Sequence, residues 1–270
     1  YFAPGKRWGP FFSGSAGWVV TAEPWMQALV EKNILNTLKL RASYGQTGNH
    51  GVGQSAAYST LSQTNYADQL AYVIGSVGNL SLGWEKTHST DVAVDFGFLG
   101  NRIQASVDWY TKTTTDLLYN IPVPATSGMT STTGNMGSVR NVGIELEIIS
   151  HNLTGALKWD TSFNMSYNKN TVLQLGTENT TVYQESNKAI NVLEVGQPMY
   201  YFYGLKCTGV WMNQKEIDDY IAKTGLTPKY AGAKIKPGDL RHEDIDGDGD
   251  ITNDDRQNLG KPTPDFTFGM

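Results

Sequence analysis

Cysteine is nearly absent from this sequence, because only Cys207 occurs among its 270 residues. An internal disulfide and a metal site built on a Cys-x-x-Cys pair are therefore excluded. No apolar run approaches the roughly eighteen residues of a membrane-spanning helix, and we expect no signal peptide at the start. Lys and Arg number 21 against 26 Asp and Glu, and no basic stripe is present, so the sequence argues against nucleic-acid binding.

Catalytic motifs are missing as well. The sequence has no His-Glu-x-x-His, no Gly-x-Ser-x-Gly and no phosphate-binding loop, and its histidines are scattered. Glu145 and Glu147 could mimic a catalytic pair of carboxylates, but no third group accompanies them. A polar strand face is the simpler interpretation of this pair, and we expect that the chain is not an enzyme.

The composition favours an all-β fold, since Gly, Tyr, Asn, Ser and Thr are abundant and helix-forming residues are sparse. Apolar and polar residues alternate with period two in the strand near residues 140–149, where Ile144 and Leu146 are interleaved with Glu145 and Glu147. The same alternation predicts strands near residues 12–20, 38–44, 91–98, 102–110 and 157–167. Each predicted strand therefore has one apolar and one polar face.

Two architectures fit such strands. In a soluble β-sandwich the apolar faces form the core, whereas in an outer-membrane barrel they face lipid and the polar faces line the lumen. The connections at residues 99–101 and 151–155 are short, while those at 45–83, 119–138 and after Asn170 are long. This alternation favours a partial antiparallel transmembrane β-barrel with tight turns at one rim and long extracellular loops at the other.

Two short helices are expected within the connections. Residues 25–35 carry apolar side chains at helical spacing. A second helix near residues 214–223 begins with a capping box formed by Asn213 and Glu216, and Gly225 can end it. Local packing accounts for both helices without assigning them a function.

The most informative stretch is Asp-Ile-Asp-Gly-Asp-Gly-Asp-Ile-Thr-Asn-Asp-Asp at residues 244–255. Its spacing matches an EF-hand-type calcium loop, with Gly249 at the sixth position, where the loop must turn sharply. The predicted ligands are Asp244, Asp246, Asp248, Asp250 and Asp255. The competing interpretation is a solvated acidic turn that uses Asp and Gly for turn chemistry alone. We favour a structural Ca²⁺ ion, because a hard cation holds so many close carboxylates together.

The loop does not belong to a paired EF-hand. Breaker-rich segments containing Pro237 and Gly238 precede it, and Gly260 and Pro262 follow it, where an EF-hand would have helices. We therefore predict that the loop and the second helix share one extracellular excursion, spanning residues 205–260.

The order of several motifs resembles the carboxy-terminal part of a SusC/RagA-type TonB-dependent outer-membrane transporter. The motifs are FFSGSAGWVVTAEPWM (11–26), LKLRASYGQTGN (38–49), LGWEKTHSTDVAVDFGFLGNRI (82–103), VDWYTKTTTDLL (107–118), NVGIELEI (141–148) and GDLRHEDIDGDGDITNDDRQNLGKPTPDFTFG (238–269). The resemblance covers nearly the whole chain. It implies that residues 1–270 form part of one 22-stranded barrel domain, with the plug and the amino-terminal part absent here.

The resemblance also implies a function. Such transporters reside in the outer-membrane lipid of Gram-negative cells, import oligosaccharides or peptides, take energy from TonB through the amino-terminal region absent here, and pair with a SusD-like surface lipoprotein. The substrate-binding residues stay unknown. The alternative is a secreted, soluble, calcium-stabilised β-sandwich that binds glycans, which the detergent requirement of the protein would distinguish.

Overall fold

The computed structural model describes residues 2–53, 56–122, 126, 128–129, 131–176, 178–186 and 189–270. The chain divides into two compact units. The first, here called the sheet unit, comprises residues 1–180 and 264–270, and the second, the insert unit, comprises residues 181–263. The predicted excursion at residues 205–260 lies within the insert unit, which is longer than predicted at both ends.

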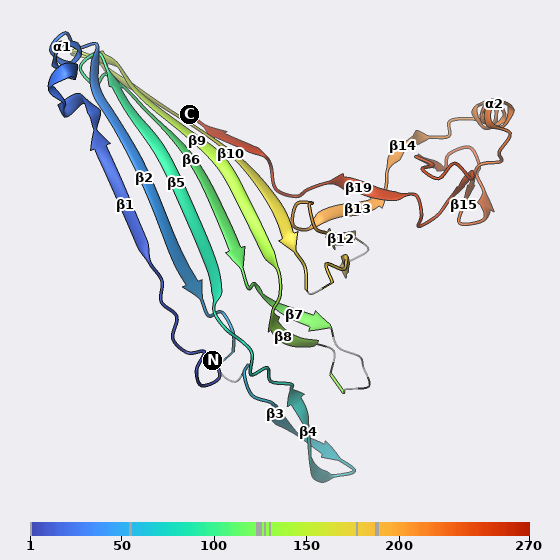
Figure 1. Ribbon diagram of the computed structural model, residues 1–270. Helices are drawn as coiled ribbons and strands as arrows, with labels where there is room; N and C mark the ends of the chain where they lie inside the picture. Colours follow the sequence, from blue (N-terminus) through green and yellow to red (C-terminus); the bar gives the residue numbers. More distant parts are fainter. Residues whose placement is uncertain are drawn as a thin grey trace. The chain divides into compact units, whose positions relative to one another are not determined.

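The sheet unit is built on one antiparallel sheet of seven strands in the order β1-β2-β5-β6-β9-β10-β20 (Figure 1). These strands are β1 (Ser13–Val19), β2 (Leu35–Asn49), β5 (Glu85–Phe98), β6 (Ile103–Thr115), β9 (Ser138–Thr154), β10 (Lys158–Gln174) and β20 (Phe266–Gly269). All six strands predicted by alternation are present, and most are longer than predicted. The ladder pairing extends into polar Thr- and Asn-rich ends, where alternation carries no signal.

The strand register aligns the apolar residues into continuous rows across the sheet. One row runs through all seven strands and consists of Trp18, Leu40, Val94, Val107, Leu146, Met165 and Phe268. A neighbouring row consists of Ala16, Ala42, Val92, Trp109, Ile144, Tyr167 and Phe266. Many of these side chains are exposed, and Trp109 is 42% exposed. Because no second layer buries this face among the described residues of the sheet unit, it is not the core of a sandwich.

The opposite face of the sheet is polar and carries an ion-pair cluster. Arg41 on β2 donates from Nε and Nη2 to the two carboxylate oxygens of Asp95 on β5, at 2.9 and 2.8 Å. The same Nη2 lies 3.1 Å from Asp108 on β6. Glu145 and Glu147 follow on β9, aligned with Asp108 and Ser106 respectively. The pair is thus part of a polar strand face, which agrees with the interpretation from the sequence.

Close approach of neighbouring strands depends on a glycine in this face. A Cβ atom built on Gly143 of β9 would lie 2.5 Å from Cζ of Tyr110 and 2.5 Å from the carbonyl oxygen of Tyr167. The Tyr110 ring therefore lies across the backbone of the next strand, where only glycine leaves room.

Short and long connections alternate as the sequence predicted. Between β5 and β6, the turn residues Leu99, Gly100 and Asn101 all have positive φ, at 54°, 70° and 61°. The long connections contain hairpins that alternation did not reveal, β3 (Thr60–Tyr66) with β4 (Gln69–Ser76) and β7 (Leu118–Pro122) with β8 (Ser131–Asn135). Residues 123–125, 127 and 130 of the connection predicted at 119–138 lie outside the described residues.

The predicted helix at residues 25–35 is largely wrong. The structure has two 3₁₀ turns, η1 (Val20–Ala22) and η2 (Pro24–Met26), then the short helix α1 (Gln27–Glu31), and β2 already begins at Leu35. Asn33 adopts φ of 54°, a left-handed conformation that ends a helix. Within the described residues, no helix is long and apolar enough to cross a membrane.

The insert unit consists of short elements. Strands β11 (Val182–Ser186), β12 (Ala189–Leu193), β13 (Tyr201–Leu205) and β19 (Arg256–Gly260) form one sheet. Smaller sheets pair β14 (Cys207–Val210) with β17 (Leu240–His242), and β15 (Lys229–Tyr230) with both β16 (Ala233–Lys234) and β18 (Asp250–Ile251).

The helix of this unit, α2 (Gln214–Thr224), confirms the second helix prediction. The Asn213 side chain accepts the backbone N–H of Glu216 at 3.0 Å, and Gly225 ends the helix with φ of 75°. The Glu216 carboxylate accepts the N–H of Met212, one residue earlier than a capping box requires.

Candidate metal loop and adjacent cavity

Carboxylates bonded to backbone N–H groups shape the acidic loop at residues 244–255. Asp244 uses one carboxylate oxygen to accept the N–H of Gly247 at 2.7 Å and the other to accept that of Gly249 at 3.0 Å. Asp246 accepts the N–H of Asp248, and Asp248 accepts that of Asp250. The first carboxylate of the loop therefore fixes the turn around both glycines, whose φ angles are 75° and 83°.

Asp255 closes the loop from the interior. Its side chain is fully buried, and its two oxygens accept the N–H groups of Ile245 and Thr252, both at 2.8 Å. Two charge-assisted hydrogen bonds compensate the buried charge. Each oxygen retains a lone pair that can coordinate a cation.

The structure brings three of the five predicted ligands together. One carboxylate oxygen from each of Asp244, Asp246 and Asp255 can be chosen so that all three lie within 4.8 Å of one another. Asp248 and Asp250 are not members of this group. Both oxygens of Asp250 instead accept the N–H of Gly232 at 3.0 Å, which ties the loop to the turn between β15 and β16.

The neighbouring carboxylates raise the pKa of Asp246. The hydrogen bond from the Asp248 N–H lowers the pKa of Asp246, whereas burial and the charges of Asp248, Asp255 and Asp244 raise it, and the net pKa is above the ordinary value. The neighbouring carboxylates thus disfavour the ionised form of Asp246, as expected for oxygens placed to share a cation.

Hydrophobic packing anchors the loop from behind. Ile251, at the eighth loop position, is 8% exposed and pairs with Tyr230 in the parallel β15–β18 ladder. Gly249 lies against Leu226, which a Cβ atom at this position would meet at 3.0 Å. The two contacts fix the middle of the loop to the apolar interior of the insert unit.

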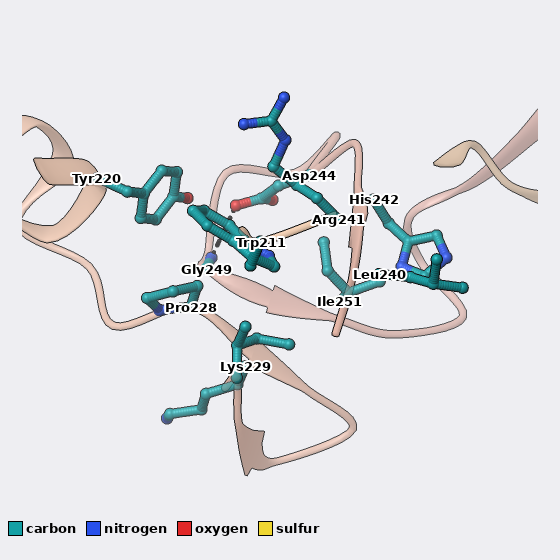
Figure 2. Close-up of a pocket in the computed structure, with 11 residues that line it drawn as sticks. Trp211, Tyr220, Pro228, Lys229, Leu240, Arg241, His242, Asp244, Gly249 and Ile251 are labelled. Atoms are coloured by element: carbon teal, nitrogen blue, oxygen red, sulfur yellow. Dashed lines mark hydrogen bonds between the residues drawn. The ribbon is translucent and has the colours of Figure 1, made fainter. Parts of the chain in front are cut away.

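A cavity of about 270 Å³ adjoins the loop (Figure 2). Its apolar wall includes Trp211, Pro228, Ile235, Leu240 and Ile251, and its polar wall includes Tyr220, Lys229, Arg241, His242 and Asp244, with Gly249 between them. Figure 2 shows the Tyr220 hydroxyl and the Asp244 carboxylate turned toward each other. Burial, followed by the nearby charge of Asp244, raises the pKa of Tyr220.

Aromatic contacts build this cavity. The Trp211 ring meets Tyr220 edge-on at 5.5 Å between centroids, and the Arg241 guanidinium carbon lies 5.6 Å from the Trp211 ring centroid. His242 packs against Tyr230 with centroids 5.7 Å apart. The sequence singled out only the acidic loop, because Trp211, which follows β14, and Tyr220, which lies in α2, have no spacing that marks a cavity.

The whole chain is similar to known proteins. Residues 4–266 match the family model described as TonB dependent receptor-like, beta-barrel. The chain belongs to the TonB-dependent receptor β-barrel family. This receptor chain is 32% identical over its full length to TonB-dependent receptor P3 of Formosa agariphila and 28% identical to TonB-dependent receptor SusC of Bacteroides thetaiotaomicron. It spans 27% and 26% of those two proteins, respectively.

Solved structures show the same fold. The RagAB peptide importer in its closed-closed state superposes with a TM-score of 0.77 at 24% sequence identity, covering 99% of the receptor chain and 28% of that chain. The predicted all-β partial barrel, the SusC/RagA-type resemblance and the outer-membrane location are thus confirmed. The alternative, a soluble secreted sandwich, finds no support, since the apolar face of the sheet is exposed.

Proposed function

We propose that this chain is part of an importer that carries oligosaccharides or peptides across the outer membrane. The exposed apolar rows across all seven strands carry the proposal, because they form a continuous surface suited to lipid. Membership of the receptor family supports it. The polar face with Arg41, Asp95 and Asp108 would then line the lumen, and the chain would serve transport rather than catalysis.

The partners follow from the same proposal. A SusD-like lipoprotein would close over the extracellular mouth, and TonB would act through an amino-terminal region. The similarity to SusC and to the fold of the RagAB importer supports this arrangement. The insert unit is the long connection that follows β10, and it leaves the sheet from the strand ends that the other long connections join, so we propose that it is extracellular.

The acidic loop is proposed to hold a Ca²⁺ ion. The donors fit, because Asp244, Asp246 and Asp255 offer hard carboxylate oxygens within 4.8 Å of one another. Asp248 and the backbone carbonyl of Asp250 complete the set that the spacing predicts. The ion would neutralise the mutual repulsion of the carboxylates and hold the loop in one conformation. Less conformational entropy would then be lost when a partner docks.

The importer proposal is tested on the native full-length protein. Outer membranes are extracted in mild detergent, and the gel mobility of boiled and unboiled samples is compared. A heat-modifiable band that needs detergent and co-purifies with a surface lipoprotein is the expected result. A band that is soluble without detergent and runs identically in both samples would contradict the proposal.

A further inference from the structure

The face of the sheet that carries the apolar rows, here called the outer face, changes in composition toward the long connections. Beyond the row that contains Trp109, the next row on this face consists of Tyr44, Thr90, Thr111, Val142 and Lys169. The row after it consists of Gln46, His88, Thr113, Arg140 and Thr171. Side chains two residues apart on a strand share a face, so both rows continue the outer face. Threonines and cations therefore follow the apolar rows.

The cations lie at the level expected for lipid headgroups. On β9 the outer positions between Arg140 and Ser150 are all apolar, namely Val142, Ile144, Leu146 and Ile148. Arg140 and Ser150 are separated by roughly 33 Å along the strand, or about 25 Å across the membrane at a strand tilt of about 40°. The apolar band of an outer-membrane barrel has the same height. Trp109 and Tyr44, at 42% and 46% exposed, precede Arg140 on this face, as in an aromatic girdle.

The outer face of the strands carries no carboxylate that could neutralise these cations. In the seven strands, all of which the structure describes, every Asp and Glu lies on the opposite face: Glu85, Asp91, Asp95, Asp108, Glu145, Glu147 and Asp160. Arg140 and Lys169 are exposed, and neither makes an ion pair or a hydrogen bond among the described residues. Lys86 differs, because its Nζ lies 3.6 Å from a carboxylate oxygen of Asp116 in the following turn. The charges of Arg140 and Lys169 are thus left for a group outside this part of the chain.

Arg140 and Lys169 are close enough to bind one anionic group together. Arg140 pairs with Thr171 on β10, and Lys169 pairs with Val142 on β9, so the two cations are diagonal neighbours about 7–8 Å apart. Two long side chains at this spacing can contact one phosphate from both sides. Thr171 and Thr113, which flank Arg140 on the neighbouring strands, add hydroxyl donors. Charge-assisted hydrogen bonds from a guanidinium to a phosphate are among the strongest available to a protein.

We propose that Arg140 and Lys169 bind the phosphate group of an anionic lipid in the outer leaflet. Its acyl chains would lie along the apolar rows below, against Ile144 and Tyr167. A free phosphate ion would meet the same cations but has no chains for these rows to contact. The site goes beyond import, because it needs only the assignment of the outer face to lipid and no cargo or partner.

Native mass spectrometry of the full-length protein in detergent tests the proposal. Phosphatidylglycerol and phosphatidylcholine are titrated in separate samples, and we expect tighter retention of phosphatidylglycerol. The double variant Arg140→Gln/Lys169→Gln should weaken its binding about thirtyfold, since each cation near a membrane surface contributes about a fivefold factor. Lys112→Gln is the matched control, because Lys112 lies on the inner face between the levels of Thr111 and Thr113, and it should bind like wild type.

A charge-preserving variant separates lost charge from lost structure. Arg140→Lys/Lys169→Arg should retain most of the binding, and a heat-modifiable band confirms that each variant has assembled. The inference is overturned if wild type retains both lipids equally, or if the double glutamine variant binds phosphatidylglycerol like wild type. Displacement of the lipid by an equal concentration of inorganic phosphate would identify a site for a free anion and would also overturn it.

Failure of this inference and failure of the importer proposal can be told apart. Loss of lipid binding in Lys112→Gln, with none in the double glutamine variant, would show that the two faces of the sheet are assigned the wrong way and would contradict both. Lipid binding that depends on Arg140 and Lys169 in a protein that imports neither oligosaccharides nor peptides would support the lipid site and remove the importer.

Discussion

The two units of this chain differ in whether they bury their apolar side chains. The sheet unit leaves many side chains of its apolar rows exposed, including Phe268 at 80% and Phe266 at 60%. The insert unit buries its apolar residues in a small interior around Trp211, Ile217 and Ile251. The stability of the sheet unit therefore depends on the apolar medium around its exposed face. The stability of the insert unit depends on its own packing and on the charges of the acidic loop. Five substitutions or conditions would test this contrast.

Placing a charged side chain in the lipid-facing apolar row should have the largest effect, a loss of barrel assembly. Leu146→Arg places a guanidinium in the central apolar row, at a cost of roughly 2–4 kcal/mol for a lipid-facing cation near the bilayer midplane. The heat-modifiable fraction in outer membranes would fall sharply. Glu145→Arg, one residue away on the polar face, is the control and should assemble normally. Equal assembly of both variants would contradict the assignment of the two faces.

A smaller loss of stability is expected from a substitution at the glycine where β9 packs closely against its neighbouring strands. Gly143→Ala would push a methyl group into the Tyr110 ring and the Tyr167 carbonyl, with an expected cost of about 1–3 kcal/mol. Urea unfolding of the barrel, followed by gel mobility, measures it. Gly155→Ala is the control, because nothing lies within 4 Å of a Cβ atom there. If the two variants unfold together, the close strand approach is not important for stability.

Asp255→Asn should destabilise the insert unit and spare the sheet unit. The amide replaces one acceptor oxygen with a donor that faces a backbone N–H, either that of Ile245 or that of Thr252, at an expected cost of about 1–3 kcal/mol. Limited proteolysis within residues 181–263 would accelerate while heat modifiability stays unchanged. The exposed neighbour provides the control, Asp254→Asn, which should be cleaved like wild type.

Removing the proposed Ca²⁺ ion should increase the protease sensitivity of the acidic loop, an effect more local than that of Asp255→Asn. Chelation of Ca²⁺ is expected to speed cleavage at residues 244–255, and the double variant Asp246→Ala/Asp248→Ala should be cleaved readily with or without chelator. The barrel should keep its mobility. Asp218→Ala/Asp219→Ala on the exposed face of α2 controls for the loss of two carboxylates. Wild-type protease resistance in the loop variant would refute the ion site.

The smallest expected effect is the pH dependence of the stability of the acidic loop. Because the folded loop raises the pKa of Asp246, its contribution to stability is present below the ordinary Asp pKa and is lost as the pH rises through the raised value. Amide protection of the calcium-free loop, corrected for intrinsic exchange, should therefore decrease with rising pH. Added Ca²⁺ should cancel this dependence. Protection that increases with pH would show that the carboxylates do not repel one another.

The sequence predicted the sheet well for a physical reason. Alternation with period two is imposed separately on every strand by the two environments of its faces, so 140–149 and 91–98 were recognisable one at a time. The hairpins β3–β4 and β7–β8 were missed because Leu61, Tyr72 and their neighbours are exposed and follow no alternation that a buried face would impose. Residues 25–35 looked helical from the spacing of their apolar residues, but the left-handed Asn33 ends the helix early.

By itself, the sequence determined the strands, their two faces, the α2 cap at Asn213 and the spacing of the acidic loop, since each of these is set by residues close together along the chain. Only the tertiary structure decided which carboxylates meet. Asp250 turned to Gly232, 18 residues away, whereas Asp255 turned inward to Ile245 and Thr252. It also created the cavity, in which residues from α2, β15, β17 and β18 converge. Contacts between short segments distant in sequence depend on packing, and packing leaves no periodic signal.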